Sequence, residues 1–243
     1  MFTTEGVKTR IFKLGEPILD FIIEVFQARS SPSALKENDI LCITSKIVSL
    51  SENRIASKHA IGKKDLIKKE ADIYLADGPY DVSLTIKHGL MIPSAGVDES
   101  NADGDFYILY PTDPFASVRK ICDGLKARLG IKNLGVILTD SHTQPLRRGV
   151  SGIALSYWGF EGVKNYAGKP DLFGRSLKYT SVHAADALAT AAVFEMGESS
   201  EAKCLAVIRG ADVRFCDKID PREGLIAPEN DLYFSLYKSQ IKQ

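Results

Sequence analysis

The sequence lacks the short motifs by which nucleotide-binding and hydrolytic enzymes are usually identified. No G-x-x-x-x-G-K-[ST] segment is present, because Gly62-Lys63-Lys64 has neither the earlier glycine nor the hydroxyl residue of a phosphate-binding P-loop. No G-x-G-x-x-G follows an expected strand, and no G-x-S-x-G could expose a nucleophilic serine. The motifs therefore give no support to a P-loop or dinucleotide-binding fold, and they disfavour an acyl hydrolase.

Paired cysteines and metal-spaced histidines are also missing. No two cysteines form a C-x-x-C pair, and the histidines at positions 59, 88, 142 and 183 do not have the spacing of metal ligands. The four cysteines lie in apolar or helical surroundings, which predicts small core or near-surface residues: Cys42, Cys122, Cys204 and Cys216. Neither a disulfide framework nor a zinc site is expected.

Charge of one sign is not in excess, since 31 Lys and Arg residues balance 31 Asp and Glu residues. A protein that binds nucleic acid or a membrane surface generally needs a basic excess, so neither partner is expected. The longest apolar-rich stretch, residues 184–196, is too short to cross a bilayer and contains Asp186 and Glu195. The N-terminus has no apolar segment typical of a secretion signal, so we expect a soluble, cytoplasmic protein.

Apolar periodicity predicts helices and strands that are interleaved along the chain. Helices are expected at residues 17–29, 58–70, 114–129, 182–196 and 232–241. Strands are expected at residues 39–44, 82–86, 90–92, 106–110, 134–138 and 205–208, with a loop at 30–32. Asp113 suits the N-cap of helix 114–129 and Gly130 its C-terminal stop, and Ser45 and Lys46 could face a ligand from a loop after strand 39–44. The class is α/β or mixed α+β, without the regularity of a doubly wound sheet.

Three carboxylates occupy positions that suit a divalent metal. Asp98 lies in an acidic, turn-rich segment, Asp140 follows an expected buried strand, and Glu198 follows an expected helix. Ligand-binding residues of α/β proteins commonly lie at the carboxyl ends of strands, and Mg²⁺ or Mn²⁺ takes few protein carboxylates together with phosphate oxygens. Each carboxylate taken singly is more often a turn or cap residue, so the spacing alone leaves both interpretations open.

Arginines accompany these carboxylates. Arg147 and Arg148 follow Asp140 within one expected loop, and Arg175 ends the segment DLFGR. Guanidinium groups pair bidentately with carboxylates or phosphates, so arginines around a metal–carboxylate centre suit phosphoryl transfer between anionic partners. Surface arginines at turns are the equally weighted alternative.

A series of motifs in fixed order carries a resemblance to a known family. The motifs are ITSKIVS (43–49), KHG (87–89), AGVDESN (95–101), DP-x-AS (113–117), ILTD (137–140), RRGV (147–150), DLFGR (171–175), AADALA (184–189) and MGE (196–198). In this order the chain resembles, from Gly6 to about Gly210, the family of coenzyme F-420-0:L-glutamate γ-ligase. The resemblance implies that family's unusual mixed α/β fold, a homodimer, and one catalytic unit over residues 1–243 that two intertwined subdomains could build. It also implies GTP-dependent addition of L-glutamate to a carboxylate acceptor, aided by two divalent cations; ATP is the alternative nucleotide.

The same resemblance implies site residues by matching position. Asp98 and Asp140 would bind a first divalent ion, Mg²⁺ or Mn²⁺. Ser141, a threonine in the family, would bind a second ion with Glu198, and K⁺ is a further candidate. Nucleotide contacts are implied for an early loop, for the residues after strand 39–44, and for the end of helix 182–196: Gly6, Val7, Lys8, Thr9, Ser45, Lys46, Asn101, Met196, Gly197, Glu198, Ser199, Ser200, Glu201, Ala202 and Lys203.

Two departures from the family pattern bear on the acceptor. Where the family has T-D-T-x-G-R, this chain has TDSHTQP at 139–145 and loses the glycine and the arginine. A nucleotide-contacting lysine expected after the I-V-S run is Leu50. The form TDSHTQPLRRGV is similar to a bacterial branch suspected of extending folates with γ-linked glutamates. We therefore rank a folate-type acceptor above the deazaflavin acceptor, which is the alternative.

The expected reaction converts the acceptor carboxylate to an acyl phosphate, which the amine of glutamate then attacks. The three arginines, Arg147, Arg148 and Arg175, would hold carboxylates or phosphate oxyanions, and His142 is the candidate for deprotonating the amine. Two other interpretations stay open. A metal-dependent phosphohydrolase would release phosphate without glutamate, and a nucleotide-sensing dimer would bind nucleotide without turnover.

Overall fold

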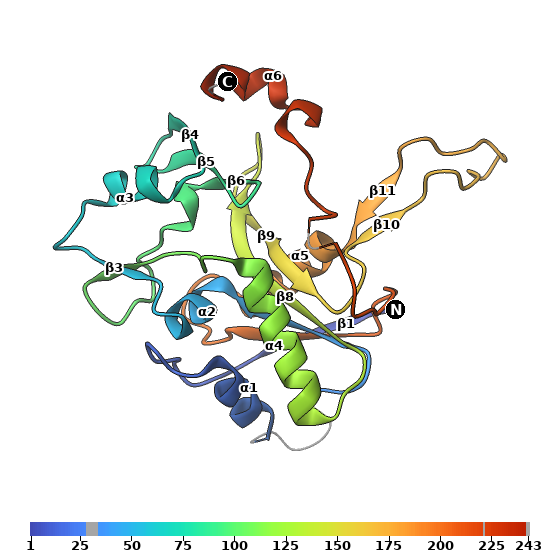
Figure 1. Cartoon of the computed structure of the whole chain (residues 1–243), viewed down its shortest axis with the longest axis horizontal. Coiled ribbons are helices and arrows are strands. Elements are labelled where there is room, and N and C mark those ends of the chain that lie inside the picture. The colour runs from blue at the N-terminus through green and yellow to red at the C-terminus, as the bar shows by residue number, and fades with distance from the viewer. Residues whose placement is uncertain (28–33, 221, 242–243) are drawn as a thin grey trace.

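A five-stranded mixed sheet organises the molecule (Figure 1). In the computed structural model, which describes residues 1–27, 34–220 and 222–241, its order is β1-β12-β2-β8-β9. The strands are β1 (Thr3–Val7), β12 (Leu205–Arg209), β2 (Asp39–Thr44), β8 (Leu134–Thr143) and β9 (Val150–Trp158). β2 and β8 are parallel, whereas the other three neighbouring pairs are antiparallel. The fold is therefore mixed, as the interleaved pattern predicts.

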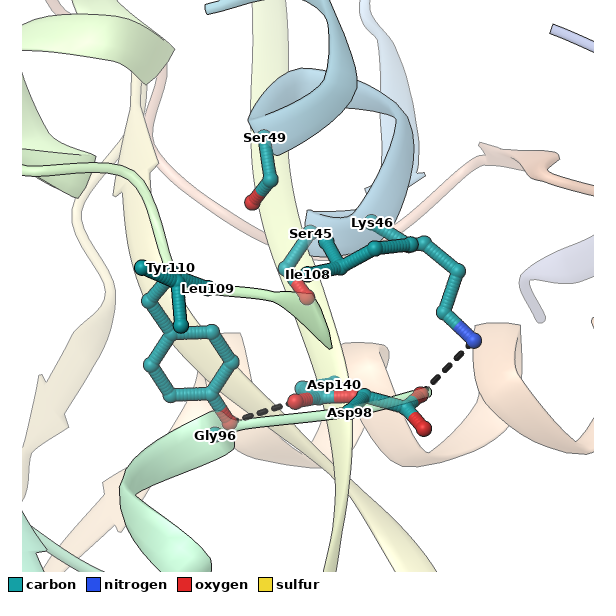
Figure 2. Close-up of a pocket in the computed structure, with 9 residues that line it drawn as sticks. All are labelled: Ser45, Lys46, Ser49, Gly96, Asp98, Ile108, Leu109, Tyr110 and Asp140. Carbon is teal, nitrogen blue, oxygen red and sulfur yellow. Dashed lines mark hydrogen bonds and ion pairs between the residues drawn. The ribbon is translucent and has the colours of Figure 1, made fainter. Parts of the chain in front are cut away.

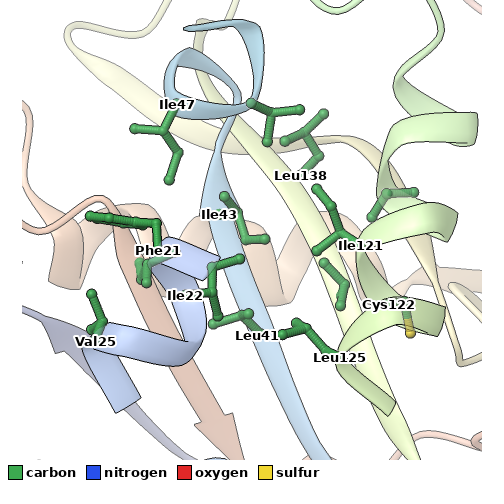
Figure 3. Packing of buried hydrophobic residues seen from close by; sticks show 14 of the residues in the cluster. Phe21, Ile22, Val25, Leu41, Ile43, Ile47, Ile121, Cys122, Leu125 and Leu138 are labelled. Carbon is green, nitrogen blue, oxygen red and sulfur yellow. The ribbon is translucent and has the colours of Figure 1, made fainter. Parts of the chain in front are cut away.

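Helices cover both faces of this sheet because its central strand is apolar on both sides. Leu41 and Ile43 of β2 pack in one cluster (Figure 3), and the alternate residues Ile40 and Cys42 pack in a second cluster behind them. The helices over the first cluster are α1 (Ile18–Gln27), α2 (Ser45–Ser51) and α4 (Pro114–Leu129), and the helix over the second is α5 (Ala184–Met196). Burying an aliphatic side chain of this size contributes about 1.5–3 kcal/mol, so the two clusters fix the layers.

Helix α5 lies close to the sheet because both surfaces carry small residues. A Cβ atom on Gly152 of β9 would lie 2.5 Å from the carbonyl oxygen of Ala189, which leaves room for glycine alone. The alanine-rich helix expected at 182–196 is confirmed, but it begins two residues later. Its start is set by His183, whose Nδ1 accepts a hydrogen bond from the Asp186 amide at 3.1 Å.

Smaller sheets and helices surround this sandwich. They are β4 (Ile73–Asp77), β5 (Ser83–Lys87) and β6 (Leu90–Pro93) beside α3 (Lys63–Glu70), the pair β3 (Ile55–Ser57) and β7 (Phe106–Ile108), the pair β10 (Val163–Asn165) and β11 (Ser181–His183), the helix α6 (Phe234–Tyr237), and 3₁₀ turns at Ser94–Gly96, Pro228–Asn230 and Lys238–Gln240. The chain between β10 and β11 forms an arm that projects from the body in Figure 1. Helix α6 packs against β4 and β5.

Most expected elements are confirmed with shifted ends. Helix 17–29 begins at Ile18 and is described to Gln27, so its last residues and the expected loop 30–32 lie outside the described residues. Helix 114–129 has the bounds that its caps predict: the Asp113 carboxylate accepts a hydrogen bond from the first turn, and Gly130 adopts a left-handed conformation with φ of 67°.

The strand expected to end at Leu138 is longer than predicted. After a bulge it continues to Thr143, because residues 139–143 pair with β9, a strand that the sequence analysis did not predict. Asp140 therefore lies within a strand, and Ser141 and His142 belong to the same strand and not to a loop. Tertiary pairing overrides the polar composition of this segment, which by itself favours a loop.

Two other segments expected as loops are regular structure. Ser45 and Lys46 form the first turn of α2, and Gly6 and Val7 belong to β1, which pairs with β12. All four cysteines are free thiols, as expected. None of the helices in the described parts of the chain is long and apolar enough to cross a membrane.

Replacing Asp113 with alanine should lower the free energy of unfolding by about 1 kcal/mol, because the cap of α4 loses its bond from the Ala116 amide, which measures 3.0 Å. Urea unfolding followed by circular dichroism measures the change. Asp123→Ala, at an exposed position of the same helix, is the matched control and should cost less than about 0.5 kcal/mol. Equal losses in the two variants would contradict the capping role.

Candidate active site

Asp98 is held in a tight turn between η1 (Ser94–Gly96) and β7. One carboxylate oxygen accepts bonds from the amides of Glu99 and Ser100, at 2.6 and 2.8 Å, and the other accepts the Ser100 hydroxyl at 3.0 Å. The backbone of Asp98 pairs in both directions with Ile108 of β7. These bonds fix the direction of the carboxylate before any ligand binds.

Lys46 brings a positive charge to this turn from the start of α2. Its Nζ lies 2.7 Å from Oδ2 of Asp98 and donates to the carbonyl oxygen of Ser100 at 2.7 Å. Burial disfavours the ionised form of Asp98, but the hydrogen bond and the charge of Lys46 outweigh it, and the pKa of the Asp98 carboxyl falls below its ordinary value. Asp98 is therefore ionised at neutral pH.

Asp140 reaches the same place from β8. Its Oδ1 accepts the amide of Ser141 at 2.9 Å, and its Oδ2 accepts the hydroxyl of Tyr110. Burial raises the pKa of the Asp140 carboxyl to about 6 against these two hydrogen bonds, and the charge of Asp98 adds to the rise. Because ionisation of Asp140 is unfavourable in this buried position, a cation next to it would stabilise the ionised form strongly.

Asp98 and Asp140 line one small cleft (Figure 2). The other lining residues come from α2, η1, and the end of β7 with the chain after it: Ser45, Lys46, Ser49, Gly96, Ile108, Leu109 and Tyr110. Figure 2 shows Tyr110 bonded to Asp140 and Lys46 paired with Asp98. The structure thus brings together four of the residues named from the sequence: Ser45, Lys46, Asp98 and Asp140.

Ser141 and Glu198 meet on the opposite face of β8. Side chains alternate along a strand, so Ser141 points away from Asp140 and toward the end of α5. Its hydroxyl donates to Glu198, while Lys46 and Asp98 are close enough for their charges to act on the Glu198 carboxyl. Partial burial of that carboxyl raises its pKa, although much of the side chain stays exposed.

The segments expected to contact a nucleotide are neighbours in space. The Thr9 amide donates to the carbonyl oxygen of Ala202 at 2.8 Å, which joins residues 6–9 to residues 196–203. The side chain of Asn101 donates to the carbonyl oxygen of Ser199 at 3.2 Å, which joins the turn of Asp98 to the same segment. One continuous rim therefore connects these three segments beside the cleft.

The arginines named from the sequence lie elsewhere. Arg147 and Arg148 are exposed at the tip of the β8–β9 hairpin, and Arg175 lies on the projecting arm, where its Nε donates to Asp171 at 3.0 Å. None of the three belongs to the described lining of the cleft. His142 is two residues beyond Asp140 on the same face of β8, and its Nδ1 lies 3.0 Å from the carbonyl oxygen of Ser151.

Two side chains whose hydroxyls donate to Asp98 and Asp140, those of Ser100 and Tyr110, were not predicted as site residues. Ser100 braces Asp98, and its place two residues after an aspartate is a signal for this type of turn. Tyr110 donates to Asp140 from the chain that follows β7. Nothing in the local sequence marks Tyr110, because its partner lies 30 residues away along the chain.

The atoms around the cleft that could bind a metal ion are oxygens, which are the ligands that Mg²⁺ and Mn²⁺ prefer. Within the described residues, no group of three or more His, Cys, Asp and Glu side chains could hold an ion by itself. The arrangement therefore fits an ion that also binds phosphate oxygens, since Mg²⁺ in such sites uses only one or two protein carboxylates. Asp98 and Asp140 fit that requirement.

Comparison with known proteins gives consistent matches. A family model described as F420-0:Gamma-glutamyl ligase matches residues 6–210. The coenzyme F420:L-glutamate ligase of Methanococcus maripaludis (strain C7) is 35% identical over 232 residues, which is 88% of this chain and 93% of the relative. The enzyme of the same name from Methanocaldococcus jannaschii is 35% identical over 241 residues, covering 90% and 93%. That of Haloarcula marismortui is 28% identical over 255 residues, covering 96% and 94%.

Asp140→Asn and Asp98→Asn should change stability in opposite directions in metal-free buffer. The raised pKa of Asp140 means that ionisation destabilises the fold, so Asp140→Asn should add on the order of 2 kcal/mol to the free energy of unfolding at pH 8. The gain should shrink as the pH falls from about 6 to about 4. The lowered pKa of Asp98 has the reverse sign: Asp98→Asn should destabilise at pH 8, and the difference should fade in acid. Urea unfolding at several pH values measures both, and a loss at pH 8 in both variants would contradict the assignment.

Proposed function

The chain belongs to the F420-0:γ-glutamyl ligase family, whose members form carbon–nitrogen bonds, and we propose that it joins L-glutamate to a carboxylate of coenzyme F420 or its precursor. The observation that carries the proposal is the meeting of Asp98 and Asp140 in one cleft beside the proposed nucleotide rim. An amide cannot form from a free carboxylate without activation, and such a cleft suits phosphoryl transfer from a nucleotide.

The acceptor named by the relatives differs from the first choice of the sequence analysis. The altered segment 141–145 favours a folate, whereas the relatives are named for coenzyme F420. Their identity extends over about nine-tenths of the chain, and the altered segment is short, so we place the deazaflavin acceptor first. A folate is the alternative acceptor, and the experiment below compares it with the deazaflavin acceptor.

The nucleotide, GTP or ATP, would lie along the rim formed by residues 6–9, Asn101 and residues 196–203. Asp98 and Asp140 would hold one Mg²⁺ or Mn²⁺, and Ser141 with Glu198 a second. These ions would neutralise phosphate oxygens as charge shifts during transfer. Lys46, which reaches Asp98 from α2, could turn toward the phosphates as a further cation.

In the proposed reaction an oxygen of the acceptor carboxylate attacks the terminal phosphorus, and the nucleoside diphosphate leaves. The glutamate amine then attacks the acyl carbon and expels phosphate. That amine must lose a proton, and His142 is the proposed base. Since a carbonyl oxygen only accepts, His142 must donate from Nδ1 to Ser151, which leaves the lone pair on Nε2 for the proton.

The arginines and the dimer stand apart from this core. Arg147 and Arg148 share a hairpin with Asp140 and could meet a carboxylate of glutamate or of the acceptor at its tip. Arg175 lies on the projecting arm, and a role for it stays a prediction of the resemblance. The homodimer is likewise a prediction, and the proposed reaction steps do not depend on it.

Incubation with labelled glutamate, GTP or ATP, and Mg²⁺ or Mn²⁺ should give a glutamylated product with the deazaflavin acceptor, identified by mass spectrometry. Parallel reactions with tetrahydrofolate, without acceptor, and without glutamate separate the alternatives. A product with tetrahydrofolate alone would replace the acceptor. Phosphate release without glutamate would indicate a phosphohydrolase, and nucleotide binding with no turnover in any mixture would indicate a sensor.

Asp140→Asn should abolish nucleotide turnover while the protein stays folded, because the cleft loses one of its two carboxylates. His142→Ala should retain metal-dependent nucleotide binding but lower kcat by about 100-fold or more at neutral pH, with partial recovery as the pH rises and the amine deprotonates unaided. His59→Ala, at an exposed histidine that pairs with Asp105, is the matched control. Unchanged kcat in His142→Ala would remove it from the mechanism.

A further inference from the structure

The geometry points to Tyr110 as the residue that positions Asp140 for cation binding, acting through the carboxylate and not on the substrate. The Tyr110 side chain is buried, with 4% of the residue exposed, and its hydroxyl donates to Oδ2 of Asp140. Oδ1 is already bonded to the amide of Ser141. With one donor on each oxygen, the carboxylate cannot rotate freely, and its remaining lone pairs have fixed directions. The inference rests on the cation site of the proposed function.

The Tyr110 ring is wedged against the turn that carries Asp98. A Cβ atom on Gly96 would lie 2.3 Å from ring carbons of Tyr110, so the ring occupies the space that any other residue would need. Gly96 has φ of 71°, a conformation that also favours glycine. Asp98 follows two residues later. One aromatic ring therefore touches the segment of one carboxylate while its hydroxyl holds the other, which sets the separation between them (Figure 2).

The backbone of Tyr110 is fixed from the other side. Its carbonyl oxygen accepts a bond from Nε of Arg54 at 3.0 Å, and Arg54 forms an ion pair with Glu70 of α3 at 2.8 Å. The carbonyl oxygen of Arg54 accepts the Leu109 amide at 2.9 Å. Hydrogen bonds thus fix Tyr110 at its backbone carbonyl and at its hydroxyl. A residue that orients a metal-binding carboxylate must itself be fixed in this way.

A second buried tyrosine, Tyr157, provides a control that separates the orientation of Asp140 by a tyrosine hydroxyl from the contribution of such a hydroxyl to stability. Tyr157 is also buried, with 3% exposed, and its hydroxyl donates to Glu223 at 2.9 Å, near the start of α5 and away from the cleft. Removing either hydroxyl leaves a buried ring and a carboxylate that has lost a donor. The two changes are chemically equivalent, but only Tyr110 faces Asp140.

The test uses the full chain as purified, with Mn²⁺ in the presence of inorganic phosphate as the probe, because the two carboxylates need phosphate oxygens to complete the site. Electron paramagnetic resonance of the free ion measures binding. Tyr110→Phe should weaken Mn²⁺ binding by about 10- to 100-fold, the range found when a donor to a metal ligand is removed. Tyr157→Phe should leave the Mn²⁺ dissociation constant unchanged while lowering the melting temperature by a similar amount. In the Asp140→Asn background, adding Tyr110→Phe should produce no further loss, because the tyrosine acts through that carboxylate.

Kinetics give an independent readout. In Tyr110→Phe the apparent KM for Mn²⁺ should rise in parallel with its dissociation constant, while the KM for glutamate stays unchanged and kcat recovers at saturating Mn²⁺. Identical Mn²⁺ titrations of wild type and Tyr110→Phe, equal weakening in Tyr157→Phe, or no Mn²⁺ binding by the wild type would each overturn the inference. Since binding is measured without glutamate or acceptor, failure to form a glutamylated product would count against the proposed function and leave this result intact.

Discussion

One ammonium group faces three carboxylates in this molecule. Lys46 pairs with Asp98 at 2.7 Å, and its charge also lowers the pKa of Asp140 and of Glu198 against the burial that raises them. Burial, together with the nearby charge of Asp98, outweighs the charge of Lys46, so ionised Asp140 destabilises the fold at neutral pH. The same cost of ionisation would favour the divalent ion that we propose for the cleft, so stability and the proposed function are opposed at this point of the structure.

Three local structural features bring these charged side chains together. Helix α2 begins directly after β2 and places Lys46 in its first turn. The turn at Asp98 is closed by hydrogen bonds that its carboxylate accepts from backbone amides. Strand β8 extends past a bulge and carries Asp140 and Ser141 on opposite faces. The mixed sheet supplies the common frame, because β2 and β8 are adjacent and parallel. Their carboxyl ends therefore meet at one edge, where ligand-binding residues of such sheets commonly lie.

The local sequence predicts those helices and strands whose caps and apolar patterns lie within or next to their own residues. The cap at Asp113, the stop at Gly130 and the apolar run of β2 each predict their structure from neighbouring residues. The extension of β8 had no such signal, because its polar residues become a strand only through pairing with β9. The start of α2 was missed for a related reason: its serines and lysine are typical of loops, and burial of Ile47 and Val48 decides for the helix.

The sequence by itself determined the family, the three candidate carboxylates and the apolar layers, since ordered motifs and periodicity are properties of the chain. Only the tertiary structure decided which of the candidate groups meet. It joined Asp98 and Asp140, separated by 42 positions in the chain, in one cleft, left Arg175 on a projecting arm, and added Tyr110 to the site. The physical reason is that contacts between distant segments are set by sheet order and helix packing, which no local pattern encodes.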